Sequence, residues 1–248
     1  MSLTNGDLYS IFLYVLNKES LSGYARPEDF GLQLKKNNVL LLRELLGLSN
    51  DYGILQYLSK QQKGYSTLLD DKTNIFKKEI PLTFSGGYAD IPADYFNYDG
   101  LMVDDAYDGV EILFSGEVAH RINNPIDSPT AEFPIATFVG SKIKMYPSTI
   151  TSADLTYYAN PTEPIFDYYI DVNGNIQYLD AGETYTLQAG EIGSGGETTG
   201  DVESASVELT WRDTEKIDIL WMILKDAGIN VLRSDITQYA SVEQQMGK

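Results

Sequence analysis

The sequence predicts an α+β fold with an N-terminal helical bundle, a β-rich middle and C-terminal helices. Apolar residues recur at helical spacing near both ends, whereas short strand-like runs begin at about residue 75. Helices and strands do not alternate as they do in a parallel α/β sheet. We therefore expect an N-terminal helical region over residues 1–74, an antiparallel sheet or sandwich within residues 75–212, and C-terminal helices over residues 213–248 that pack back on the N-terminal region.

Capping and breaking residues place three helices in the N-terminal region. Thr4 and Asp7 match a capping box before the first helix, whose apolar face holds Leu8, Ile11, Phe12, Val15 and Leu16. Pro27 suits the first position of a second helix, which we expect to end before Gly47. A third, shorter helix is expected over residues 52–61.

Short runs between turn residues predict the strands. A hairpin is expected where Asn173-Gly174 joins residues 166–172 to residues 175–179, because Asn-Gly favours a type I′ turn. Other strands are expected over residues 80–84, 109–114, 134–138, 142–146, 154–158 and 207–211.

Two helices are expected after the last of these strands. Asp213 or Thr214 can cap the first, which Gly228 ends, and Ser234 can cap the second, over residues 235–245.

Residues 188–206 form a polar, glycine-rich segment with four acidic and no basic residues. Such a composition buries too little apolar surface to order itself, so we expect a mobile loop unless a neighbouring subunit holds it. The residues that we expect to become ordered on assembly are Gly190, Glu191, Gly195, Gly196, Glu197 and Asp201.

The charge of the chain is strongly negative and unevenly spread. The net charge is −18, and residues 81–248 carry 27 Asp and Glu against 8 Lys and Arg. A cluster of basic residues, which phosphate binding requires, is missing from the sequence. The acidity therefore indicates either simple solubility or a surface that repels DNA sliding past it.

Composition also predicts where the protein resides. No apolar run approaches the roughly 20 residues that cross a bilayer. The opening, Met1-Ser-Leu-Thr-Asn-Gly-Asp7, lacks the features of a signal peptide. We expect a soluble protein that is made in the cytoplasm, or is built into something assembled there.

Few residues can support catalysis. The chain has no cysteine and a single histidine, His120, which lies in or beside an expected strand and has no Gly-x-Ser-x-Gly motif with it. The sequence from Asp171 to Ile176 starts like a calcium loop, but glycine occupies the fourth position instead of the sixth, so a hairpin turn is the better interpretation. We expect no enzymatic activity, and no catalytic, cofactor-binding or metal-binding residue.

Aromatic residues are the candidates for contacts between subunits. Tyr157-Tyr158 and Tyr168-Tyr169 place neighbouring rings on opposite faces of a strand, so one ring of each pair can pack inward while the other meets a partner. The candidate contact residues are Tyr157, Tyr158, Tyr168, Tyr169, Trp221 and Tyr239.

Several segments, taken in order, resemble head-to-tail connector proteins of crAss-like and related tailed phages of Bacteroidetes. They are Asp7-Leu-Tyr9, Leu16-Asn-Lys18, Gly23-Tyr-Ala-Arg-Pro-Glu-Asp-Phe30, Leu155-Thr-Tyr-Tyr-Ala-Asn-Pro-Thr-Glu-Pro164, Val207-Glu-Leu-Thr-Trp211, Ile217-Asp-Ile219, Gly228-Ile-Asn230, Gln238-Tyr-Ala240 and Gly247-Lys248. Arg26 departs from the pattern, because the family places a serine or threonine cap before the proline.

The resemblance implies a virion protein of the phage neck, an adaptor or ring component between portal and tail. Its implied partners are copies of itself in a twelve-fold ring, the portal protein and other neck or tail proteins, with DNA passing nearby without specific binding. Two alternatives remain open: another tail or capsid-associated structural protein, and, from a different class, a hydrolase with a β-rich domain.

Overall fold

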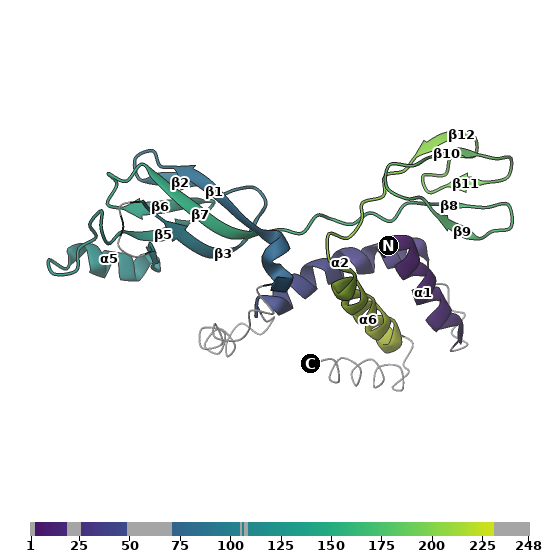
Figure 1. Cartoon of the computed structure of the whole chain (residues 1–248), viewed down its shortest axis with the longest axis horizontal. Coiled ribbons are helices and arrows are strands. Elements are labelled where there is room, and N and C mark those ends of the chain that lie inside the picture. The colour runs from purple at the N-terminus through teal and green to yellow at the C-terminus, as the bar shows by residue number, and fades with distance from the viewer. Residues whose placement is uncertain (1–2, 19–25, 49–70, 105, 107–108, 231–248) are drawn as a thin grey trace. The chain divides into compact units, whose positions relative to one another are not determined.

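The structure is a computed structural model that describes residues 3–18, 26–48, 71–104, 106 and 109–230. Its helices and antiparallel sheets confirm the predicted α+β class (Figure 1). The expected helices over residues 52–61 and 235–245 lie outside the described residues.

The chain divides into two compact units. Unit 1 comprises residues 1–72 and 161–248, and unit 2 comprises residues 73–160. This division differs from the expected single β-rich region over residues 75–212, because the strands that follow residue 160 belong to the same unit as the helices.

Three helices of unit 1 begin near the residues that the sequence indicates. The capping box before α1 (Asn5–Lys18) is confirmed: the Asp7 amide donates to the Thr4 hydroxyl at 3.1 Å, and the Thr4 amide donates to the Asp7 carboxylate at 3.0 Å. Pro27 is the first residue of α2 (Pro27–Leu45). α6 (Asp213–Asn230) continues past Gly228, since a helix tolerates glycine at a cost of about 1 kcal/mol.

An aromatic cluster joins the helices of unit 1 to its strands. The ring of Phe166 lies 5.0 Å from that of Tyr9 on α1, 5.4 Å from that of Phe30 on α2 and 5.0 Å from that of Tyr178. α6 packs against both α1 and α2. The hydrophobic core of this unit is therefore shared between helices from both ends of the described chain and the strands between them.

The strands of unit 1 form two small antiparallel sheets. β8 (Tyr168–Ile170) pairs with β9 (Ile176–Tyr178) and with β11 (Ile192–Gly193). β10 (Thr184–Leu187) pairs with β12 (Gly200–Glu203).

The hairpin predicted around Asn173-Gly174 is present, but its turn is not of type I′. The Asp171 amide donates to the Asn175 carbonyl at 2.9 Å, and the Gly174 amide donates to the Asp171 carbonyl at 2.9 Å. Three residues therefore separate the last hydrogen-bonded pair, and only Gly174, with φ of 83°, lies in the left-handed region. The Asp171 carboxylate also accepts hydrogen bonds from the backbone amides of Asn173 and Asn175, so this side chain helps to close the turn.

Two short strands lie in the segment for which a mobile loop was expected: β11 and β12 fall within residues 188–206. The strand expected over residues 207–211 is reduced to an isolated bridge between Val207 and Ile165, because no longer strand lies beside it to continue the pairing.

Unit 2 is a small sandwich of two sheets. β1 (Lys77–Thr83), β7 (Ser152–Ala159) and β3 (Tyr95–Met102) form one antiparallel sheet, with β7 in the centre. The second sheet has the order β2-β6-β5-β4; its strands are β2 (Tyr88–Asp90), β6 (Lys142–Tyr146), β5 (Ile135–Val139) and β4 (Glu111–Ile112).

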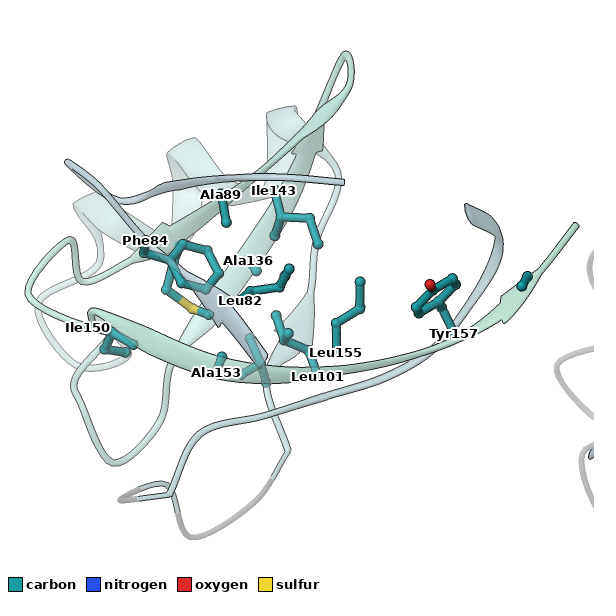
Figure 2. Packing of buried hydrophobic residues seen from close by; sticks show 13 residues of the cluster. Leu82, Phe84, Ala89, Leu101, Ala136, Ile143, Ile150, Ala153, Leu155 and Tyr157 are labelled. Atoms are coloured by element: carbon teal, nitrogen blue, oxygen red, sulfur yellow. The ribbon is translucent and has the colours of Figure 1, made fainter. Parts of the chain in front are cut away.

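Both sheets bury side chains in one core. Leu82, Leu101 and Leu155 come from the first sheet, and Figure 2 shows them pointing toward Ala136 and Ile143 of the second. The core of unit 2 therefore lies between its two sheets.

The strand expected over residues 109–114 is also wrong in its length. Only Glu111 and Ile112 are in β4, which is parallel to β5, and α5 (Ser115–Asn123) connects the two strands. The Glu117 carboxylate accepts a hydrogen bond from the Phe114 amide at 3.1 Å, which caps α5 at the last residue of the expected strand.

Replacing Gly6 in α1 tests the packing of the helices on the hairpin. A Cβ atom there would lie 2.5 Å from Cδ1 of Tyr178, whose ring stacks on Phe166 and whose hydroxyl donates to Glu208 at 2.6 Å. We expect Gly6→Ala to lower the free energy of unfolding by about 1–3 kcal/mol, measured by urea titration. Gly31→Ala is the control, since its Cβ would meet Phe166 at an ordinary 3.7 Å; equal losses in both variants would contradict this packing.

Candidate contact surface

Tyr157 and Tyr158 are both buried, at 2% and 7% exposed, so neither ring is available to a partner in this structure. The expectation of one inward and one outward ring fails because β7 is the central strand of its sheet, and both of its faces are covered at this point. The Tyr157 hydroxyl donates to Asp94 at 2.8 Å, and Lys78 donates to the same carboxylate at 2.6 Å. Burial, with Asp94 as a second cause, raises the pKa of Tyr157 to about 12.

The second tyrosine pair also serves the chain's own fold. Tyr168 is buried in the aromatic cluster, and its hydroxyl donates to Glu28 of α2 at 2.5 Å. Tyr169 is half-buried, and its ring stacks on that of Tyr185 at 4.2 Å. Trp221 is half-buried on α6, and Tyr239 lies outside the described residues.

Internal hydrogen bonds hold the segment that was expected to wait for a neighbouring subunit. Glu191 is buried, and its carboxylate accepts hydrogen bonds from the Gln188 amide at 2.7 Å and from the Tyr185 hydroxyl at 3.1 Å. Asp201 is exposed and accepts from the Thr186 hydroxyl at 2.6 Å. These contacts, all within unit 1, fix both ends of the segment.

Glycines shape the middle of the same segment. Gly190 and Gly196 have φ of 96° and 89°, and a Cβ on Gly195 would lie 2.3 Å from Glu197 Oε1. Next to this turn, the buried carboxylate of Asp167 accepts hydrogen bonds from the Ser194 hydroxyl and the Ala205 amide. Asp167 lies outside the segment, so composition within residues 188–206 did not reveal it.

His120 lies on α5 and is exposed, which corrects its expected position in or beside a strand. No group of acidic or histidine side chains within the described ranges is arranged to hold a metal ion. No helix in the described part of the chain is both long and apolar enough to cross a membrane.

The structure instead exposes large apolar side chains on α5 and the loops beside it. Their exposed fractions are 77% for Phe114, 40% for Ile122, 90% for Ile126 and 56% for Phe133, and we call these four residues the α5 patch. All four lie within residues 114–133, and exposed apolar side chains concentrated in one stretch of the chain are candidates for contact with another molecule. Sequence reasoning missed it because residues 109–114 were assigned to a strand, although Glu117, three residues after Phe114, is a usable helix-start signal.

Hydrogen bonds hold the backbone beneath the α5 patch in place. The Ile126 amide donates to the Asn124 side chain at 3.1 Å, and the Phe133 amide donates to the Thr130 hydroxyl at 3.2 Å. The Arg121 guanidinium nitrogens lie 3.4 Å from a carboxylate oxygen of Glu111 and 3.7 Å from one of Asp127, so Arg121 links the helix to the segments on both sides. These contacts connect α5 to the segments before and after it.

Comparison with known proteins does not assign the chain to a family. No protein-family model and no curated protein matches the sequence.

The Tyr168–Glu28 hydrogen bond predicts a pH dependence of stability. The pKa of Glu28 is lowered, chiefly by this bond, so its stabilising effect is present above the unfolded pKa of about 4.3 and is lost as the pH falls through the lower folded value. We expect Tyr168→Phe to reduce the free energy of unfolding by about 1 kcal/mol at pH 7, and by less at pH 3. Urea titrations at both pH values measure the difference.

The control for this prediction is Tyr14→Phe, because Tyr14 is 68% exposed. It should leave stability nearly unchanged at both pH values. A loss for Tyr168→Phe that is the same at pH 3 and at pH 7 would contradict the role given to the carboxylate.

Proposed function

We propose that this chain is a structural subunit of a tailed-phage virion, part of a ring that joins portal to tail around the DNA channel. The observation that carries the proposal is the α5 patch, which presents four large apolar side chains on a fixed backbone. A subunit that acts by repeated contact with its neighbours needs such a surface and no catalytic group. The sequence resemblance to connector proteins supplies the place in the particle, and the twelve-fold ring that it implies belongs to the same proposal.

The charge distribution supports a position beside DNA. Residues 161–211 contain ten acidic residues and no Lys or Arg. The acidic residues of this stretch that are exposed are Glu163, Asp180, Glu183, Glu197, Asp201 and Glu203. A surface of this kind repels the phosphate backbone, so DNA can pass without being held.

The alternatives differ in what they require. A hydrolase that uses His120 needs the imidazole beside a serine in a pocket, whereas His120 is exposed on the surface of α5. A tail or capsid-associated structural protein would use the same apolar surface, and it differs from the proposed neck component only in its position within the particle. Imaging therefore separates these two structural functions.

The α5 patch can be removed without loss of the fold. Phe114→Ser places a preferred capping residue at the N-cap of α5, and Ile126 is almost fully exposed. We expect the double variant Phe114→Ser/Ile126→Ser to keep its free energy of unfolding within about 0.5 kcal/mol of the wild type. It should nevertheless fail to enter virions when it complements particles that lack the chain, as measured by mass spectrometry of purified particles.

The control is the double variant Leu32→Ser/Met102→Ser, which removes two side chains that are 64% and 63% exposed elsewhere on the chain. It should enter virions normally. Cryo-electron microscopy of the wild-type particles should locate the chain between portal and tail. Equal incorporation of both double variants, or density for the chain at another position, would overturn the proposal.

A further inference from the structure

The outward face of β6 in unit 2 differs in charge from the rest of the chain. Ile143 and Met145 point into the core and are fully buried. Lys142, Lys144 and Tyr146 alternate with them, so they lie on the opposite face of the sheet. Two lysines two residues apart thus form a basic spot on a strongly acidic protein.

Lys144 is held in position by aromatic rings. Its ammonium nitrogen lies 5.2 Å from the ring centre of Tyr88 on β2 and 4.8 Å from that of Tyr146. Cation–π contacts of this kind fix the direction of the side chain without neutralising its charge.

Among the described residues, Lys144 has no carboxylate partner. Every other Lys or Arg of unit 2 lies within ion-pair distance of one: Lys77 with Asp99, Lys78 with Asp94, Arg121 with Glu111 and Asp127, and Lys142 with Asp90. The Lys142–Asp90 pair is itself open to solvent, with both side chains more than half exposed. The positive charge of Lys144 is therefore not paired with a carboxylate of the described residues, and the two rings hold it in place.

A surface of opposite charge lies on the ribbon formed by β10 and β12 in unit 1. Asp201 and Glu203 are exposed and two residues apart on β12, so they share one face of the ribbon. Thr186 and Thr184, which are also exposed, lie opposite them on β10. No cation lies near them in sequence, because residues 161–211 contain none.

We propose that the outward face of β6 binds the β10–β12 ribbon of a second copy of this chain. Lys142 and Lys144 have the same two-residue spacing as Asp201 and Glu203, which is about 6.6–6.8 Å along a strand. Lys144 can meet one carboxylate of this row directly, and Lys142 can meet the other by exchanging its exposed partner Asp90. The ring of Tyr88 and the side chain of Val139 border this side of the contact.

This contact is heterologous, because each copy carries the basic face on unit 2 and the acidic face on unit 1. A head-to-tail contact generates a ring when the rotation closes, so the inference rests on the proposed ring and deepens it. A second copy fits better than nucleic acid, since one unpaired lysine on a chain of net charge −18 provides little attraction for a phosphate backbone.

Cysteine cross-linking tests the contact directly, because the chain has no cysteine of its own. Val139→Cys lies beside the basic face and Thr184→Cys beside the acidic face, and both residues are exposed. The two variants are purified with different tags, mixed at low ionic strength and treated with a short bismaleimide. Only products that carry both tags are counted, so a link within one chain does not contribute.

We expect the Val139→Cys and Thr184→Cys pair to cross-link at least about tenfold faster than a pair of Val139→Cys with Ser10→Cys, an exposed position on α1. Adding Lys144→Glu to the first protein should remove this advantage. Adding Glu203→Lys to the second protein as well should restore it. Lys35→Glu, which makes the same change of charge at a half-exposed position on α2, should have little effect.

Cross-linking that is no faster than with Ser10→Cys, or that is indifferent to Lys144→Glu, would overturn the inference. A Lys144-dependent shift of a fluorescent single-stranded oligonucleotide, without the cross-link, would also overturn it and point to nucleic acid. These outcomes leave the proposed function standing if wild-type particles hold the chain between portal and tail. Absence of the chain from virions, together with a charge-dependent cross-link, would instead refute the neck function and keep the self-contact.

Discussion

The buried amide of Asn38 is the interaction on which unit 1 depends, because that unit is built from two parts of the chain separated by the whole of unit 2. Its oxygen accepts a hydrogen bond from the Trp211 indole at 2.6 Å, and its nitrogen donates to the Thr162 carbonyl at 2.9 Å. One side chain on α2 thus fixes both where the chain returns from unit 2 and where α6 begins. The nearby pairs of Lys35 with Glu163 and Arg212 with Asp71 are exposed and contribute little. Leaving a buried polar group without a hydrogen-bond partner costs about 1–3 kcal/mol of folding free energy. Few other side chains at position 38 could both donate and accept these bonds.

The periodic elements of the fold could be predicted from the sequence, whereas the contacts between distant segments could not. The Thr4–Asp7 capping box and Pro27 lie within a few residues of the helices that they start, so their signals are local. β11 and β12 are short, polar strands whose partners lie many residues away. These strands are held by long-range hydrogen bonds such as those that Asp167 accepts. The composition of residues 188–206 could not predict these bonds, because Asp167 lies outside that segment.

Two of the candidate contact residues are buried for a related reason. Alternation along β7 correctly places Tyr157 and Tyr158 on opposite faces, but it does not reveal that β7 is the central strand and that both faces are covered there. Conversely, the exposure of Phe114 and Ile126 depends on α5 projecting from the connection between two parallel strands, and a parallel pairing is not visible in the period of either strand. Whether a side chain is buried depends on the segments that pack against it, and these segments are not identified by the local sequence pattern.

The chain is rich in tyrosine and in acidic residues, and the structure connects these two features of its composition. Tyrosine hydroxyls donate to carboxylates on both units: Tyr157 to Asp94, Tyr168 to Glu28, Tyr178 to Glu208 and Tyr185 to Glu191. At Glu191 and Glu208 this neutral donor takes the place of a Lys or Arg, whereas Asp94 also pairs with Lys78. Such bonds suit a chain with 36 acidic and 18 basic residues. These tyrosines are therefore occupied in internal bonds. The part of the negative charge that remains at the surface is the part available to repel DNA or to meet Lys144 of another copy, and the α5 patch is left as the apolar surface that a neighbouring protein can cover.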